Sequence, residues 1–125
     1  MLTLNDILQG ALQAYNTGQF EESRQLLKSG LALDEQCQPC LWGLIKVCDA
    51  LQDEHGSVHY LHKLATLLPD DITVLEALTA RCQMPKHLDL AIDLYASYLH
   101  RKPDSADGHY NHAYLLARAG KPSSR

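Results

Sequence analysis

The chain has 125 residues, of which 46% are hydrophobic and 21% charged, and its formal net charge at pH 7 is -4. This apolar content is enough for one compact domain, whereas the acidic balance argues against nucleic acid as a partner, because phosphate binding requires a basic excess on one face. The first residues carry no positively charged signal region, and no run approaches the roughly 20 apolar residues of a membrane span. We therefore expect a cytoplasmic protein with no membrane insertion.

Apolar residues recur at helical spacing from the start of the chain. They predict a first helix over 4–15, closed by Gly18, and a second helix that begins at Phe20. Pro39 suits the first turn of a third helix, where its missing N–H costs no hydrogen bond. These helices are short and separated by brief turns, which favours antiparallel helix pairs.

The second half of the chain continues this pattern. A fourth helix is expected to begin near His55 or Ser57 and to stop before Pro69. Its successors are a fifth helix over 72–82 and a sixth that stops before Pro103. The sequence therefore predicts two more antiparallel helices after the first two pairs.

A seventh predicted helix, which opens within 104–107 and ends at Gly120, has no partner after it. Sliding the sequence by 34 residues superposes Pro69 on Pro103 and aligns three sets of core positions: Leu41, Leu75 and His109; Leu44, Leu78 and His112; and Cys48, Cys82 and Leu116. Such a period is typical of helix-turn-helix repeats, in which each unit stacks on the next to bury its apolar face. We predict one domain over 1–120, with repeats at about 4–37, 38–71 and 72–105, a half-repeat at 106–120, and a truncated or flexible tail at 121–125.

Three kinds of position recur in these units. The two slots where paired helices would touch hold Ala11, Ile45, Thr79 and Ala113 in the first helices, and Ser23, Ser57 and Ala91 in the second. The turn between the two helices of a unit holds Gly18 and Gly120 in the first and last units, and Gln52 and Lys86 in the middle units. The position that follows the second helix of a unit holds Pro69 and Pro103, with Glu35 at this position in the first unit. This arrangement resembles the tetratricopeptide repeat (TPR). The resemblance implies an all-α fold, an α-α superhelix (TPR solenoid) of about seven antiparallel helices, with three full repeats and half of a fourth.

The resemblance also implies a function, because TPR proteins hold extended or helical peptides in a concave groove lined by the first helix of each unit. The predicted groove residues are Leu8, Leu12, Tyr15, Asn16, Trp42, Lys46, Asp49, Glu76, Ala80, Gln83, Tyr110, Asn111, Tyr114 and Arg118. The aromatic residues among them are the most informative, since interfaces favour large amphipathic rings. The alternative is that these rings pack against neighbouring helices.

One TPR subclass clamps the C-terminal carboxylate of its ligand with lysine, asparagine and arginine. The corresponding residues here are Leu8, Leu12, Gly43, Thr73 and Ala77. None of these side chains can bind a carboxylate by charge, so we expect no preference for a peptide with a free C-terminus over its amide.

The segment Cys37-Gln38-Pro39-Cys40 is the sharpest chemical motif. Two cysteines at a helix N-terminus resemble the dithiol of thioredoxin-like enzymes, in which the helix end stabilises the thiolate. The strand-helix-strand setting of such enzymes is absent, which favours a plain loop between repeats. A closed zinc site is disfavoured, because it needs four ligands and the only other thiols, Cys48 and Cys82, fall at interior positions suited to small hydrophobic residues.

Seven histidines raise the question of metal binding. His55, His59 and His62 share one face of the fourth helix, and His109 and His112 have a three-residue spacing on the seventh. A solvated face explains the first set better than a metal site. The second set interrupts a core stripe, so these two residues either face solvent or await a further helix that would satisfy them.

No serine has a neighbouring histidine and acid in the arrangement of a nucleophile, and no glycine-rich phosphate loop follows a predicted strand. We therefore predict a non-catalytic protein- or peptide-binding scaffold that uses no cofactor and no metal. The alternative is the N-terminal TPR module of a larger bacterial enzyme, such as a transferase, which serves targeting or substrate presentation. A homodimer formed through the exposed terminal helix is a third hypothesis.

Overall fold

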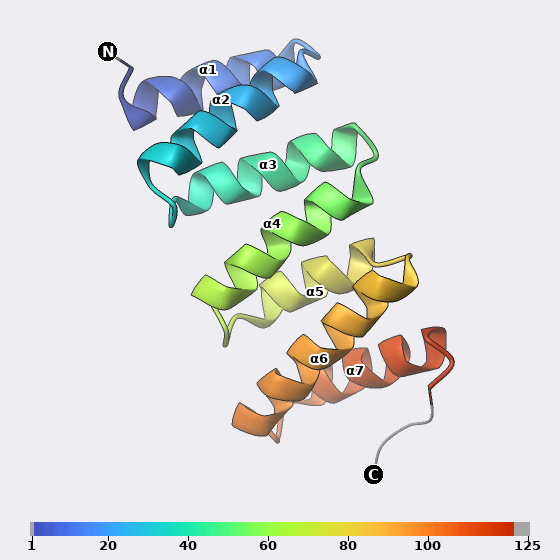
Figure 1. Cartoon of the computed structure of the whole chain (residues 1–125). Helices are drawn as coiled ribbons and strands as arrows, with labels where there is room; N and C mark the ends of the chain where they lie inside the picture. Colours follow the sequence, from blue (N-terminus) through green and yellow to red (C-terminus); the bar gives the residue numbers. More distant parts are fainter. Residues whose placement is uncertain (1, 122–125) are drawn as a thin grey trace. The chain divides into compact units, whose positions relative to one another are not determined.

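The structure is a computed structural model that describes residues 2–121. Within that range the chain forms seven α-helices and no strand, as predicted (Figure 1). The helices are α1 (Leu4–Asn16), α2 (Phe20–Leu33), α3 (Gln38–Ala50), α4 (Glu54–Leu67), α5 (Ile72–Arg81), α6 (Pro85–Arg101) and α7 (Ala106–Arg118). The last four residues of the predicted tail lie outside the described range.

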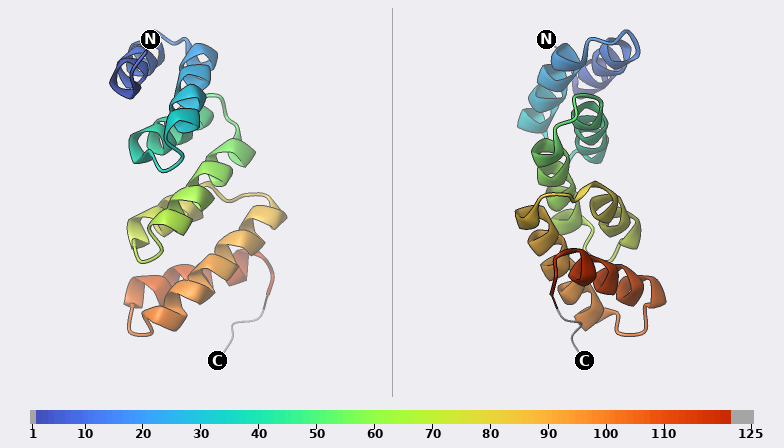
Figure 2. Two further views of the ribbon diagram at one scale, coloured as in Figure 1. Left: turned by 60° about the vertical axis from the view of Figure 1, so that its left-hand side comes forward. Right: turned by 90° about the vertical axis from the view of Figure 1, so that its right-hand side faces the viewer.

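The chain divides into two compact units, Met1–Leu64 and Ala65–Arg125, with the boundary inside α4. In the first unit, α1 packs on α2, and α2 and α1 both pack on α3. In the second unit, α6 packs on α7, and both contact α5. Figure 2 shows the pairs α1/α2 and α6/α7 side by side from two directions.

The first helix pair is stabilised by a cap at the start of α1 and by small residues where α1 and α2 touch. Thr3 and Asp6 make the expected capping box, in which the Asp6 amide donates to Thr3 Oγ1 (3.2 Å) and the Thr3 amide donates to Asp6 Oδ2 (3.1 Å). Ala11 is only 2% exposed, and the buried Ser23 hydroxyl donates to its carbonyl oxygen at 2.8 Å. A larger side chain in either slot would separate α1 from α2, so the small residues fix the close approach.

The same inner turn occurs three times, after α1, α3 and α7. Its central residue adopts a left-handed backbone conformation, with φ of 81° at Gly18, 56° at Gln52 and 72° at Gly120. Glycine adopts this conformation without steric cost, whereas glutamine does not. Gln52 therefore keeps the TPR-like turn although it lacks the TPR-like residue.

The turn between α5 and α6 differs, because Pro85 begins α6 and draws Lys86 into the helix. The position that aligns with the turn glycines is therefore helical in this unit. As a result α5 has 10 residues and α6 has 17, compared with 13 for α1 and 14 for α2.

Side-chain caps mark the starts of α4 and α7; α4 begins earlier than predicted, whereas α7 begins within the predicted 104–107 window. The α4 helix begins at Glu54, before the predicted start, because the Asp53 carboxylate accepts a hydrogen bond from the Gly56 amide at 3.0 Å. Likewise, Ser105 Oγ accepts from the Gly108 amide at 3.0 Å at the start of α7.

Buried apolar side chains from each helix pair make the core of each unit. In the first unit the central residues are Ala11, Leu27, Leu44 and Val47. In the second, Tyr95 is fully buried and its hydroxyl lies 2.9 Å from the hydroxyl of Thr79, which also donates to the Leu75 carbonyl oxygen at 3.0 Å. Cys48 and Cys82 are both fully buried, in agreement with the interior positions predicted for them.

Candidate ligand-binding site

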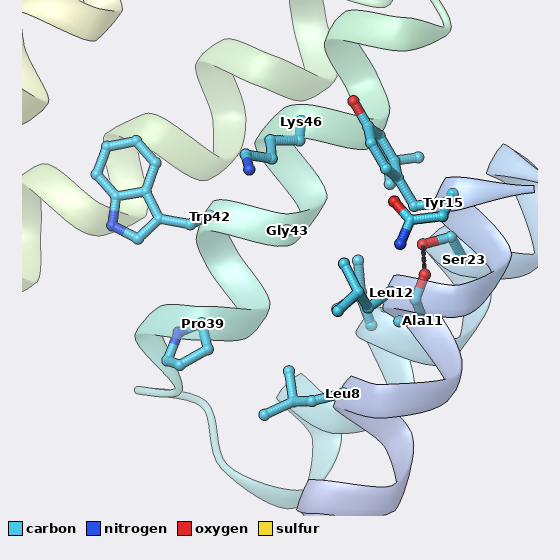
Figure 3. A pocket seen from close by; sticks show the side chains of 12 residues that line it. Leu8, Ala11, Leu12, Tyr15, Ser23, Pro39, Trp42, Gly43 and Lys46 are labelled. Carbon is cyan, nitrogen blue, oxygen red and sulfur yellow. Dashed lines mark hydrogen bonds between the residues drawn. The ribbon is translucent and has the colours of Figure 1, made fainter. Parts of the chain in front are cut away.

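A cavity of about 290 Å³ opens between α1 and α3 in the first unit (Figure 3). Its lining residues come from the first three helices: Leu8, Ala11, Leu12, Tyr15, Asn16, Ser23, Leu27, Pro39, Trp42, Gly43, Lys46 and Val47. Most of these side chains are apolar, so the cavity offers its occupant an environment that favours the burial of a hydrophobic group.

Two helical stripes build the walls of this cavity. Leu8, Leu12 and Tyr15 follow each other along one face of α1, and Figure 3 shows Leu8 and Leu12 projecting toward α3. Leu12 is 61% exposed, although a leucine on a helix that faces its neighbour would ordinarily be covered. Its exposure leaves apolar surface for a ligand to bury.

The opposite wall depends on a glycine. A Cβ built on Gly43 would lie 3.0 Å from Leu27 Cδ1, so the absence of a side chain lets α3 approach Leu27 closely. Pro39 and Lys46 flank this glycine on α3, and the Trp42 ring projects from α3 on the side away from α1 (Figure 3). Gly43 therefore lines the cavity without a side chain, and the Trp42 ring lies at the edge of the cavity.

The rim supplies a small number of polar groups. The side chain of Lys46 is exposed and is the one charged group among the lining residues, most of which are apolar. Tyr15 is held by an edge-on contact with Phe20, in which the ring centroids are 5.4 Å apart. An apolar side chain next to a carboxylate matches this combination, since the cavity can bury the first and Lys46 can pair with the second.

Six of the seven groove residues predicted in this unit line the cavity together, namely Leu8, Leu12, Tyr15, Asn16, Trp42 and Lys46. Asp49 does not line it; its Oδ1 instead accepts a hydrogen bond from the Ser57 hydroxyl at 2.7 Å. The lining residues absent from the predicted set include Pro39 and Gly43, which share the helical face of Trp42 and Lys46. That spacing was the signal by which they could have been found.

In the second unit the predicted residues form a different surface. Tyr110 is 73% exposed and Tyr114 is 45% exposed, one turn apart on α7. Arg118 donates to Gln83 Oε1 at 2.7 Å and to the Cys82 carbonyl oxygen at 3.2 Å, and its guanidinium carbon lies 5.8 Å from the Tyr114 ring centroid. Arg118 therefore connects α7 to the end of α5.

Three predicted residues of this unit remain: Ala80 is exposed on α5, and the other two, Glu76 and Asn111, lie near the buried tyrosine. Burial raises the pKa of Tyr95 to about 12; the nearby negative charge of Glu76 adds to this rise, while hydrogen bonds to Thr79 and Asn111 oppose it. Glu76 itself is exposed, and Asn111 is half-buried. Asn111 thus supports the core of the unit as well as facing its surface.

Cys37 and Cys40 are free thiols at the start of α3, and both are buried. Cys37 is the N-cap residue, and its Sγ lies 2.9 Å from Cys40 Sγ. Burial, followed by the contact with Cys37, raises the pKa of Cys40 to about 12, so Cys40 is a protonated thiol near neutral pH.

The three histidines of α4 lie on a solvated face, whereas His112 on α7 is half-buried and His87 on α6 is only 4% exposed. The side chains of His55, His59 and His62 are exposed on α4. Partial desolvation of the His59 ring, followed by the positive charge of Lys63, lowers the pKa of His59. On α7, His109 Nε2 lies 2.7 Å from the Pro103 carbonyl oxygen. Across residues 2–121, no group of three or more histidine, cysteine or acidic side chains is arranged to hold a metal ion.

No helix in the described part of the chain has both the length and the apolar character needed to cross a bilayer.

No protein-family model matches the sequence, and no curated protein matches it significantly. Among solved structures, two crystal forms of a protein titled MamA AMB-1 superpose with TM-scores of 0.70 and 0.65 at 21% identity, each over 96% of this chain. A thermophilic TPR protein of Thermus thermophilus, TTC0263, superposes with a TM-score of 0.51 at 16% identity over 95% of this chain.

These similarities identify the fold as that of a TPR-type helical repeat, in agreement with the all-α solenoid expected from the 34-residue period. The chain spans 66% and 71% of the length of the two MamA chains and 67% of TTC0263. At these levels of identity the likeness concerns the fold.

Proposed function

We propose that this protein is a non-catalytic scaffold that binds a protein or peptide ligand on the groove-forming face of its first helices. The observation that supports this proposal is the cavity of about 290 Å³ in the first unit, which six independently predicted groove residues line. Its apolar walls and its one cation are the features that peptide sites use to bury an anchor and orient it.

The ligand that fits this cavity best is a peptide segment with one aliphatic or aromatic anchor beside an acidic residue. The anchor would cover the exposed surface of Leu12 between α1 and α3, and the acid would pair with Lys46. The rings of Trp42, Tyr110 and Tyr114 would supply the remaining contact surface of their respective units, since aromatic side chains contribute strongly to binding energy.

A selection from a random peptide library on the wild-type protein tests the proposal. We expect the selected peptides to share an apolar residue next to Asp or Glu, and we expect Trp42→Ala and Lys46→Glu to weaken their binding. Because Lys46→Glu reverses the charge, this variant should also reject acidic peptides in favour of basic ones. Selected peptides that bind Trp42→Ala and Lys46→Glu as tightly as wild type would rule out this cavity as the site.

Lys28 supplies a matched control for the lysine variant. It is an exposed lysine on α2 and does not line the cavity. Lys28→Glu makes the same change in net charge as Lys46→Glu, so a purely long-range electrostatic effect would appear equally in both. Loss of binding in Lys46→Glu alone would assign the effect to the cavity.

Self-association through α7 is a second candidate, because two large aromatic side chains on this helix, Tyr110 and Tyr114, stay exposed. A homodimer would cover both rings at an isologous interface. Sedimentation over a wide concentration range tests it: the wild type should shift from monomer to dimer, and Tyr110→Ser should weaken the association. A strictly monomeric protein at high concentration would contradict this candidate.

The scaffold role is the same whether the chain acts alone or as the N-terminal module of a larger bacterial enzyme, such as a transferase. In the second case the cavity would present the substrate or direct the enzyme to its location. A reading frame that continues past Arg125 into a catalytic domain would favour the module.

A further inference from the structure

The Cys37–Cys40 pair at the start of α3 is not used by the proposed ligand site. From its geometry we propose that these two thiols are a redox site, at which a low-molecular-weight disulfide such as oxidised glutathione converts them reversibly into an internal disulfide. The proposal concerns a chemical modification of the chain and does not depend on the identity of any peptide ligand.

The two sulfurs are already in contact. Cys37 Sγ lies 2.9 Å from Cys40 Sγ and also accepts a hydrogen bond from the Cys40 amide at 3.4 Å. A disulfide bond has an S–S distance of about 2.05 Å, so the sulfurs need to approach by only about 0.9 Å. The helix start therefore holds the pair close to the bonded arrangement while both thiols are free.

Packing against α2 keeps the Cys40 thiol in this position. A Cβ built on Gly30 would lie 2.6 Å from Cys40 Sγ, so the missing side chain of Gly30 provides the space that the sulfur occupies. Cys40 is 0% exposed, and Leu4 and Ile7 also lie close to the same glycine. The sulfur has little room to rotate away from Cys37.

Access distinguishes the two thiols. Cys37 keeps 5% of its surface exposed, whereas Cys40 has none, so an incoming reagent meets Cys37 first. The Cys37 thiolate attacks one sulfur of the small disulfide and releases one thiolate, which leaves a mixed disulfide on Cys37. Cys40 then loses its proton and attacks Cys37 Sγ, which releases the second thiolate. In total, two cysteine thiols lose two electrons and two protons, and one glutathione disulfide becomes two molecules of glutathione.

The two other cysteines provide a contrast within the molecule. Cys48 is fully buried beside Arg24, and burial raises its pKa. Cys82 is fully buried where its carbonyl oxygen accepts from Arg118. The redox site is therefore specific to the first turn of α3.

Oxidation of this site would also affect the cavity. Pro39 stands between the paired cysteines and lines the cavity, so a disulfide would stiffen one cavity wall. This consequence rests on the proposed function, whereas disulfide formation does not.

The test uses the full chain, reduced and then incubated under native conditions with oxidised glutathione. We expect the intact mass to fall by two hydrogen atoms, peptide mapping to place the disulfide between Cys37 and Cys40, and dithiothreitol to reverse the change. The emission of Trp42, the only tryptophan, should shift with the same time course, because it lies two residues after Cys40.

Two variants keep the test decisive. Cys37→Ser should fold, because serine is a good helix N-cap residue, and should lose the disulfide completely. The double variant Cys48→Ala/Cys82→Ala should still form it. The proposal is overturned if the wild type stays fully reduced, if it stops at a mixed disulfide with glutathione, or if the pair instead retains Zn²⁺ that blocks oxidation.

Discussion

The close contact between Gly30 and Cys40 makes a specific prediction about the first unit. Gly30→Ala would ordinarily stabilise a helix interior such as that of α2 by about 1 kcal/mol, because alanine is the better helix former. Here the added Cβ would lie 2.6 Å from Cys40 Sγ and 3.3 Å from Leu4 Cδ1. Overpacking of this kind costs about 1–3 kcal/mol. We therefore expect a net loss of up to about 2 kcal/mol in the free energy of unfolding, as the difference between these terms.

A second substitution reverses the sign of this effect. Cys40→Ala removes the sulfur that the new methyl group would meet, so Gly30→Ala in that background should be neutral or stabilising by up to about 1 kcal/mol. The double-mutant cycle should then give a coupling free energy of about 1–3 kcal/mol between the two positions. Such a value would show that the contact with the Cys40 sulfur is the main source of the strain.

Urea unfolding in the presence of dithiothreitol measures these free energies, with Trp42 fluorescence as the probe of the first unit. Gly10→Ala on α1 is the matched control, because its Cβ would meet Leu26 Cδ1 at 3.5 Å, an ordinary van der Waals distance. This variant should be neutral or more stable than wild type. If Gly30→Ala and Gly10→Ala have the same effect, or if the cycle is additive, the packing argument for Cys40 is wrong.

Three further substitutions test other parts of the fold. Gln52→Gly should stabilise the protein by about 0.5–1 kcal/mol in urea unfolding, because it removes a left-handed glutamine; a loss of stability would contradict this. Tyr95→Phe should cost about 1 kcal/mol, since it removes the buried hydroxyl that pairs with Thr79, and no change would show that this hydrogen bond contributes nothing. Burial, and secondly His109, lowers the pKa of His112 from 6.5, so between the folded and unfolded pKa values the unfolded chain binds more protons. Stability should therefore fall as the pH drops through about 6.5, and His112→Gln should flatten this part of a pH series of unfolding curves; an unchanged slope would contradict the assignment.

The helices and their pairing could be predicted from the sequence, because both follow from local patterns. Apolar residues at helical spacing mark each helix, Pro39 marks the start of the second unit, and Pro69 and Pro103 mark the ends of the second and third units. The departures come from local capping and turn chemistry. Asp53 starts α4 earlier than the apolar pattern suggests, and Pro85 converts an expected turn position at Lys86 into helix.

The candidate site was predictable in part, since the exposed side of α1 and α3 follows from the same helical spacing. The depth of the cavity was not, because it depends on how closely α3 approaches Leu27, and this distance is set by Gly43. The Cys37–Cys40 motif could be recognised in the sequence. The close packing of the Cys40 sulfur against Gly30 could not, since that contact joins residues of different helices. Sequence spacing gives neighbours on one helix, whereas contacts between helices require the fold.

The most direct measurement of the central claim compares two leucines with nearly identical exposure in the same unit. Leu12, which lines the cavity, is 61% exposed, and Leu33, at the end of α2 and outside the cavity lining, is 62% exposed. Calorimetric titration with a peptide selected on the wild-type protein should show that Leu12→Ala weakens binding by roughly 5- to 30-fold, the effect of about 1–2 kcal/mol of lost apolar contact. Leu33→Ala should bind like wild type. Equal affinities for the Leu12→Ala and Leu33→Ala variants would contradict the assignment of the cavity between α1 and α3 as the ligand site.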